Sequence, residues 1–332
     1  MSRNFLNKVI HGGKVKSIRE RGNPDILDFS ANLNPAPPKL NFFPDPKNLS
    51  YYPDDSYYAL KLAISKIFRR KPEEITVGNG SIEIIRVFCA SFLKPGDIVH
   101  IQEPTFGEYA YSAGLYGAEI GDSKSRAKAS FFCNPNNPTG ELVTKEYLEG
   151  YLRDCAESDR ILFLDEAFIE LSDPSQSMVA NCDPSLFVLR SLTKSFSVPG
   201  IRFGYGFGDC DLIEKMEAVR PPWTVNTFAE EFALEAFRHY QDLEASRRYI
   251  HKEREWLMNK FSDFPVRIYP SSTNFILLDF GEDITDLCAG LEREGILVRD
   301  CHSFGLPTCI RVAVRTRDEN RRLIEAFIRC VH

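Results

Sequence analysis

Residues 161–168 read ILFLDEAF. The stretch begins with four apolar residues, and an aspartate, Asp165, follows them directly. A short apolar run without alternation, closed by polar residues, is typical of a strand that is buried on both faces of a parallel sheet. Asp165 is therefore expected at the carboxyl end of a buried strand. Because a buried carboxylate is costly unless it is paired, two interpretations remain open: the N-cap of a following helix, or the partner of a cation.

The same unit, an apolar run followed by a polar or glycine-rich turn, recurs on both sides of this segment. The other copies are ITVGNGS (75–81), DIVHIQEPTFGEY (97–109), ASFFCNPNNPTG (129–140) and LFVLRSLTK (186–194). Ligands of such sheets lie at the carboxyl ends of the strands, so the five turns are expected to converge on one site. The predicted fold class is α/β, with a large domain whose mostly parallel central sheet is flanked by helices and a smaller α+β C-terminal domain.

The pattern changes near both ends of the chain. The first forty or so residues are rich in Pro, Asn and Gly, which predicts an extended arm rather than a helix. Residues 227–261 have the spacing of one or two long amphipathic helices, and strands and helices of a smaller domain follow them. The predicted division is an N-terminal arm (1–45), a large domain (46–225) and a small C-terminal domain (226–332).

Composition narrows the class of protein. The 332 residues are 43% hydrophobic and 27% charged, as in an ordinary soluble globular chain, and the net charge of -6 argues against a nucleic-acid partner. The nine cysteines include no C-x-x-C pair, so no metal site is predicted, and reduced thiols in a cytoplasmic protein are expected. No apolar run approaches the roughly 18 residues of a membrane span, and no secretory signal is visible.

Two of the turns have both a plain and a functional interpretation. The turn GNGS (78–81) brings two glycines to the start of a helix, where N–H groups and the helix dipole suit a phosphate. A simple strand-to-helix turn would look the same, and the spacing is not that of a Walker loop. The turn CNPNNPTG (133–140) is rich in turn-forming residues, yet it follows a strand that points to the same edge as Asp165.

Lys194 lies in the turn SLTKSF (191–196), between Ser191 and Thr193 on one side and Arg202 on the other. A single lysine is usually a solvated charge. Hydroxyls and a guanidinium, however, make an anion cradle, and a lysine beside it whose pKa is depressed by burial and a nearby cation is suited to form a Schiff base. An anion site, a carboxylate and an imine-forming amine are together what pyridoxal 5'-phosphate requires.

The motifs NNPTG (136–140), DEA (165–167), SLTKSF and GIRFGY (200–205) occur in an order that resembles the aspartate-aminotransferase superfamily of pyridoxal-phosphate enzymes. Within it, the chain is similar to the histidinol-phosphate aminotransferase branch, which also contains threonine-phosphate decarboxylase. The resemblance runs from residue 11 to the last helix and implies the aspartate-aminotransferase-like fold.

The resemblance also implies roles for individual residues. Lys194 would form the imine with the cofactor, Asp165 would pair with its ring nitrogen, and Asn137 would bond its phenolic oxygen. Phe106 would stack on the ring. The residues that would hold the cofactor's phosphate are Gly80, Ser81, Ser191 and Arg202, with Tyr52 reaching the phosphate site of the neighbouring subunit. This last role implies a homodimer with shared sites.

Two features depart from that branch. Phe168 stands where the aminotransferases of the branch usually have tyrosine, which removes a hydroxyl from the neighbourhood of the phenolic oxygen. The segment 118–129 is also short for the family.

Three short matches, HGG (11–13), DFSANLNP (28–35) and PPWTVN (221–226), resemble the decarboxylase. The implied ligands of a small phosphorylated amino-acid substrate are His11, Asn32, Arg299 and Arg311, since bidentate arginine suits carboxylate and phosphate alike. We therefore expect decarboxylation of L-threonine O-3-phosphate to 1-amino-2-propanol O-2-phosphate in cobalamin biosynthesis. The alternatives are an aminotransferase acting on histidinol phosphate or a related amino acid, and a non-catalytic ligand sensor with the same fold.

Overall fold

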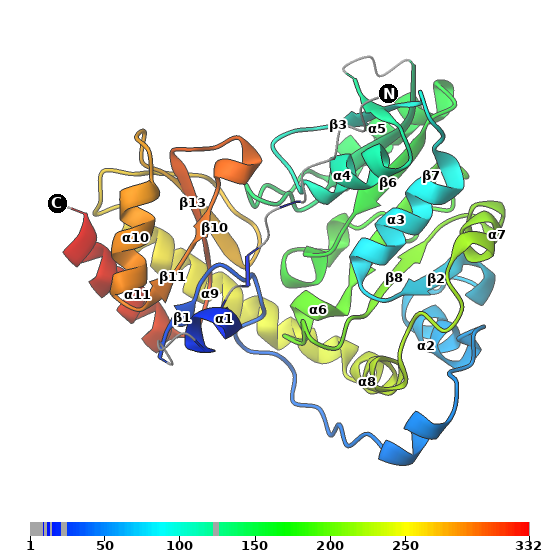
Figure 1. Cartoon of the computed structure of the whole chain (residues 1–332), viewed down its shortest axis with the longest axis horizontal. Coiled ribbons are helices and arrows are strands. Elements are labelled where there is room, and N and C mark those ends of the chain that lie inside the picture. Colours follow the sequence, from blue (N-terminus) through cyan, green and yellow to red (C-terminus); the bar gives the residue numbers. More distant parts are fainter. Residues whose placement is uncertain (1–8, 10–11, 14, 21–24, 122–125, 332) are drawn as a thin grey trace.

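The computed structural model describes the chain apart from residues 1–8, 10–11, 14, 21–24, 122–125 and 332. It has a large unit built around a central sheet and a smaller unit beside it, with the N-terminal segment crossing between the two (Figure 1). This is the α/β architecture that the repeated strand-and-turn pattern predicts.

The central sheet has the strand order β2-β8-β7-β6-β5-β3-β4 among the described residues. Its strands are β2 (Ile75–Gly78), β3 (Ile98–Ile101), β4 (Glu119–Ile120), β5 (Ala127–Cys133), β6 (Ile161–Asp165), β7 (Leu186–Ser191) and β8 (Gly204–Phe207). Neighbours pair in parallel except β8, which is antiparallel to β2 and β7. The strands before all five predicted turns therefore end at the same edge.

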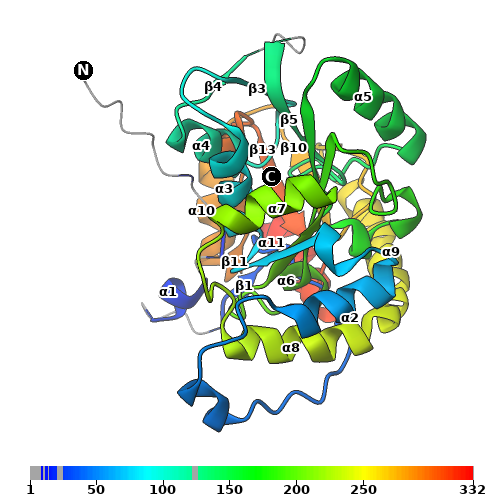
Figure 2. The same ribbon diagram turned by 90° about the vertical axis from the view of Figure 1, so that its right-hand side faces the viewer.

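Helices cover both faces of this sheet. The helices α3, α4 and α7 pack on one face, and α2, α5 and α8 pack on the other (Figures 1 and 2). Their bounds, with the short α6, are α2 (Tyr58–Phe68), α3 (Ser81–Phe92), α4 (Glu108–Leu115), α5 (Lys145–Glu157), α6 (Leu192–Ser195), α7 (Cys210–Val219) and α8 (Thr227–Arg238). None of the helices described is both long enough and apolar enough to cross a membrane.

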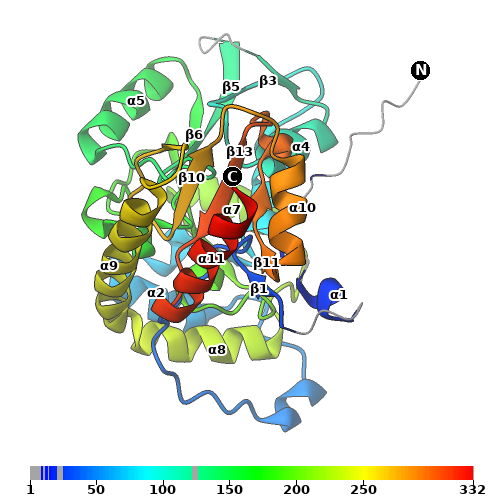
Figure 3. The same cartoon turned by 90° about the vertical axis from the view of Figure 1, so that its left-hand side faces the viewer.

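The smaller unit is an antiparallel sheet backed by helices (Figure 3). Its strands, in the order β12-β13-β10-β9, are β12 (Arg299–Asp300), β13 (Cys309–Ala313), β10 (Phe275–Asp279) and β9 (Arg267–Ile268), and its helices are α9 (Leu243–Phe261), α10 (Thr285–Arg293) and α11 (Arg317–Cys330). A core of aliphatic and phenylalanine side chains joins sheet and helices. The predicted helical stretch 227–261 is two helices, since a 3-10 turn at Tyr240–Asp242 separates α8 from α9.

The N-terminal segment is partly built into the smaller unit. Strand β1 (Leu27–Asp28) pairs in parallel with β11 (Ile296–Leu297), and Phe29 is fully buried in the core of that unit. The expectation of no helix is wrong for α1 (Val15–Glu20), because the run that breaks helices begins only after it. The three-part division of the chain remains a prediction.

A buried ion network stabilises the loop after β6. The Arg190 guanidinium, 1% exposed, is 2.9 Å from Glu166 Oε2 and 2.5 Å from Glu170 Oε1, and donates to Ser177 Oγ at 2.7 Å. The Tyr205 hydroxyl donates to Glu170 Oε1 at 3.1 Å. Two buried carboxylates therefore depend on a single guanidinium.

We predict that Arg190→Met lowers the free energy of unfolding by about 3–5 kcal/mol, because it leaves two carboxylates buried without a counter-charge. The matched control is Arg248→Met, which breaks the exposed ion pair with Glu244 and should cost less than about 1 kcal/mol. Urea unfolding of both variants, at one protein concentration, measures the difference. A similar small loss for both would contradict the role given to the network.

Candidate active site

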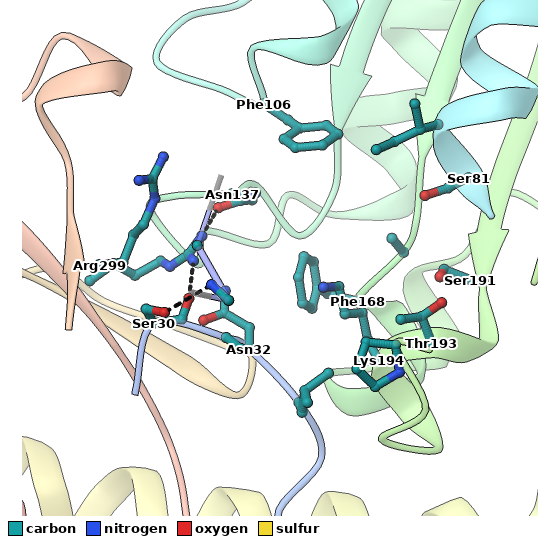
Figure 4. Close-up of a pocket in the computed structure, with 18 of the residues that line it drawn as sticks. Ser30, Asn32, Ser81, Phe106, Asn137, Phe168, Ser191, Thr193, Lys194 and Arg299 are labelled. Carbon is teal, nitrogen blue, oxygen red and sulfur yellow. Dashed lines mark hydrogen bonds between the residues drawn. The ribbon is translucent and has the colours of Figure 1, made fainter. Parts of the chain in front are cut away.

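A cavity of about 400 Å³ lies at the carboxyl edge of the central sheet, where the smaller unit faces it. Every one of the five predicted turns contributes a side chain: Ser81, Phe106, Asn137, Asp165 and Lys194. Figure 4 shows Ser81, Ser191 and Lys194 on one side of this cavity and Asn32 and Arg299 on the other.

Lys194 is carried by the short helix α6, which begins directly after β7. Its ammonium group lies 5.9 Å from the centroid of the Phe168 ring, and Phe168 is itself packed edge-on against Phe275. Burial, reinforced by the charges of Arg311 and Arg202, lowers the pKa of Lys194 to about 8, against the opposing effect of Asp165. The amine is therefore much more readily neutral than that of a surface lysine.

Asp165 is 5% exposed and accepts two hydrogen bonds. The Tyr109 hydroxyl donates to Oδ2 at 2.7 Å, and the Ala167 N–H donates to Oδ1 at 2.8 Å. Burial raises the pKa of this carboxyl, while both hydrogen bonds and the charge of Lys194 act to lower it. The bond to Ala167 forms a local turn and no α-helix begins there, so the arrangement differs from a helix N-cap.

The three asparagines of the turn CNPNNPTG (133–140) make different contacts. Asn134 exchanges two hydrogen bonds with the backbone of Val143, at 2.9 and 3.1 Å. Asn136 donates to the carbonyl of Pro104 at 3.0 Å and so links this turn to the one after β3. Asn137 is left facing the cavity, where its side-chain oxygen accepts from the Arg311 guanidinium.

An anion cradle lies between β7, β8 and the start of α3. Ser81, Ser191 and Arg202 line it, and the positive end of the α3 dipole faces it. Gly80 has φ +79°, and a Cβ there would collide with the Arg202 guanidinium. A Cβ on Gly204 would lie 2.6 Å from the Ser81 nitrogen, so glycine at both positions lets backbone and guanidinium approach closely.

Two arginines form the opposite wall. Arg299 and Arg311 are directly paired between β12 and β13 and are 8% and 6% exposed. Arg311 Nη2 donates to the carbonyl of Ser30 at 3.0 Å, and Asn32, with its amide oxygen turned toward it, accepts from Nη1 and Nε at 3.2 Å. Arg299 Nη2 donates to Ser303 Oγ at 2.7 Å. Two guanidinium groups held side by side offer a site for an anionic substrate.

Tyr52, one of the predicted residues, does not line this cavity in the described structure. Tyr52 is 79% exposed and stacks on Trp223 with the ring centroids 4.6 Å apart. His11 lies outside the described residues, although Gly12 and Gly13 line the cavity.

Three residues that line the cavity were not predicted from the sequence: Tyr109, Ser303 and Phe304. Tyr109 lies three residues after Phe106, in the first turn of α4, and this closeness in sequence could have placed both at one site. Ser303 and Phe304 lie in a 3-10 turn after β12 that has no signal in the sequence.

The residues present fit pyridoxal 5'-phosphate. A buried carboxylate, a lysine with a lowered pKa and a glycine-lined anion cradle meet in one cavity, and Phe106 offers an aromatic face to a ring. The carboxylate can pair with the ring nitrogen of that cofactor, the lysine with its carbonyl carbon, and the anion cradle with its phosphate.

Comparisons with known proteins agree with this cofactor. A histidinol-phosphate aminotransferase of Symbiobacterium thermophilum is 30% identical over 97% of this chain and 95% of its own. The solved histidinol-phosphate aminotransferase of Clostridium acetobutylicum is 31% identical, with a TM-score of 0.80, over 91% of this chain and 98% of that one. The enzyme of Sinorhizobium meliloti, solved with pyridoxal 5'-phosphate, shares the fold (TM-score 0.84, 19% identity, 99% and 98% covered). Pyridoxal 5'-phosphate is the cofactor of this protein.

The expected decarboxylation of threonine phosphate, and with it the assignment to cobalamin biosynthesis, is wrong. Relatives about 30% identical over nearly the full chain are named histidinol-phosphate aminotransferases, whereas the threonine-phosphate decarboxylase of Porphyromonas gingivalis, at 21% identity (TM-score 0.79, 92% and 99% covered), shows the fold alone. The matched segment DFSANLNP misled because Asn32 and Asn34 bond Arg311 and α6, contacts that do not specify a reaction.

The model of the family "Aminotransferase class I and II" matches residues 30–327, which include both walls of the cavity and the lysine between them. The chain belongs to this family of pyridoxal-phosphate enzymes.

Proposed function

We propose that the protein is an aminotransferase that transfers the amino group of L-histidinol phosphate to 2-oxoglutarate. The relatives named above support this substrate. The observation that carries the proposal is the buried arginine pair, Arg299 and Arg311, facing Lys194 and Asp165 across one cavity. Both substrates of the reaction are anions, and each would use these guanidinium groups in turn.

Each residue of the cavity then has a task. When bound, pyridoxal 5'-phosphate supplies a conjugated ring that accepts the electron pair left when a bond to the substrate's Cα breaks. We propose that Asp165 holds the proton on the ring nitrogen, Asn137 bonds the phenolic oxygen and Phe106 covers the ring. The phosphate would be held by Gly80, Ser81, Ser191 and Arg202.

Lys194 is the proposed proton carrier. Its Nζ is the amine that would hold the cofactor, and it would also be the group that takes the proton from the substrate's Cα. The lowered pKa leaves a larger fraction of this amine neutral near pH 7 than an ordinary lysine would have, and only the neutral amine can fill either role. Phe168 places an apolar wall beside the amine, which limits its solvation.

Exposed apolar side chains near Tyr52 support the expected homodimer. Large apolar side chains close to Tyr52 in sequence are exposed, and so is Trp223, whose ring packs against it; the others are Phe43, Leu49, Tyr51 and Tyr58. An exposed cluster of this kind is suited to burial against a second copy. We propose that Tyr52 contacts the cofactor phosphate of the partner subunit.

The first experiment incubates the cofactor-loaded enzyme with L-histidinol phosphate and 2-oxoglutarate. We expect glutamate to form in proportion to the phosphorylated 2-oxo product, and dephosphorylated L-histidinol to react at least about tenfold more slowly, because it lacks the charge that an arginine binds. Glutamate release is measured by a coupled dehydrogenase assay. No glutamate from a protein that carries bound cofactor would refute the substrate assignment while leaving the cofactor intact.

The pH dependence of cofactor uptake tests the lowered pKa of Lys194. Only the neutral amine attacks a carbonyl, so the rate of cofactor uptake by the cofactor-free protein should rise with pH and level off above about 8, instead of above the ordinary lysine value of 10.5. Asp165→Asn should move the midpoint to lower pH, because the Asp165 charge favours the protonated amine. Lys194→Ala should abolish the covalent linkage, whereas Lys61→Ala, which removes a distant lysine paired with Glu217, should not. A midpoint near 10.5 would contradict the lowered pKa.

Subunit mixing tests the placement of Tyr52. If the sites are shared, a heterodimer of Lys194→Ala and Tyr52→Ala subunits has one intact site, and random mixing should recover roughly a quarter of wild-type activity. If Tyr52 serves its own subunit, both sites of the heterodimer are damaged and activity is not recovered. Steady-state rates of the mixture, compared with each parent alone, distinguish the two outcomes.

A further inference from the structure

The helix that carries Lys194 cannot hold its own shape. With four residues, α6 is far shorter than the length at which a helix is stable alone, so its orientation depends on what its carbonyl groups bind. Two of these carbonyls are bound by the chain just beyond the helix: Phe196 N donates to Leu192 O at 3.0 Å, and Val198 N donates to Thr193 O at 3.1 Å. The carbonyls of Lys194 and Ser195 remain.

Asn34 binds both. Its backbone N–H donates to Lys194 O at 3.0 Å, and its side-chain Nδ2 donates to Ser195 O at 2.7 Å. Its own carbonyl accepts from the Ser197 hydroxyl. Asn34 is 3% exposed, so water has little access with which to replace these bonds. All four carbonyls of α6 are thereby satisfied, two of them by one residue that lies 160 positions away in sequence.

Position 34 uses both the N–H donor and the oxygen acceptor of the asparagine side chain. Nδ2 is the donor to α6, while Oδ1 accepts from the Ala36 N–H at 2.9 Å and so fixes the turn from which Nδ2 is aimed. Aspartate would keep the acceptor but place a negative oxygen against a carbonyl, and alanine would lose both bonds.

The segment around Asn34 also connects α6 to the arginine wall. Two residues earlier, Asn32 accepts from the Arg311 guanidinium, and two before that the carbonyl of Ser30 accepts from Arg311 Nη2. Residues 27–36, which we call the interdomain thread, therefore touch the proposed anion site at one end and the lysine helix at the other. An anion that draws on Arg311 competes for the bonds of this thread.

We infer that Asn34 is a positioning residue: it clamps α6, fixes the direction in which the Lys194 amine points into the cavity, and links that direction to the state of Arg311. The inference uses Lys194 as the reactive lysine of the proposed function but does not depend on which amino acid is the substrate.

The experiment compares the Asn34→Ala and Asn34→Asp holoenzymes with the Asn320→Ala holoenzyme as control. Asn320 is also buried and also donates from Nδ2 to a backbone carbonyl, that of Arg315, but it lies in the smaller unit and does not line the cavity. We expect kcat to fall about 10-fold to 100-fold in both Asn34 variants, because a small misplacement of the amine slows proton transfer, with KM changed less than about threefold. The control should lose stability without this change in kcat.

Hydrogen exchange of the holoenzymes supplies a readout that does not depend on the substrate. The amides of Phe196 and Val198, which bond α6 carbonyls, should exchange at least about tenfold faster in the Asn34 variants and at an unchanged rate in the control. If an Asn34 variant does not fold, Ser197→Ala tests the same clamp by removing only the hydroxyl bond to Asn34, with a smaller change in the same direction. Unchanged exchange and unchanged kcat in folded variants would overturn the inference. A wild-type enzyme inactive on histidinol phosphate, but with faster exchange in the variants, would refute only the substrate.

Discussion

Arg190 has its charge buried in the sheet, and the loop after β6 takes its shape from the need to balance that charge. Glu166 and Glu170 both pair with it, so both ends of the chain between them are held at this one guanidinium. Two of the residues in between, Ala167 and Phe168, line the cavity together with Asp165. A rigid ion network that takes no part in the chemistry thus fixes the position of the carboxylate on which the chemistry depends.

The electrostatics of the cavity follow from this arrangement. Among the described residues, its walls carry three guanidinium groups, those of Arg202, Arg299 and Arg311, against two carboxylates, those of Asp165 and Asp28. The surplus of positive charge attracts phosphate and carboxylate groups. Burial is the main cause that lowers the pKa of Lys194, and the charges of Arg311 and Arg202 lower it further. The same charge distribution therefore favours both anion binding and a neutral amine.

The sheet and its active edge could be predicted because they depend on local features: apolar runs of strand length, each closed by a polar turn. The antiparallel strand β8 escaped prediction, since two of its four residues are glycines that give no apolar signal. The hydrogen bond from the Tyr109 hydroxyl to Asp165 joins residues 56 positions apart, so no local pattern predicts it. The clamp of Asn34 on α6 is set by contacts across 160 positions, and no local pattern encodes such a pairing.

The interdomain thread has a consequence for the order in which the protein is completed. During synthesis its residues leave the ribosome among the first, but its hydrogen-bond partners Leu297 and Ala313 are among the last. The central sheet can form earlier, because its strands end at residue 207. Until β11 and β13 exist, Asn34 has no anchor on the smaller unit to hold it against α6. Lys194 is added to the chain midway through translation, but it reaches its final orientation only when nearly the whole chain has been synthesised.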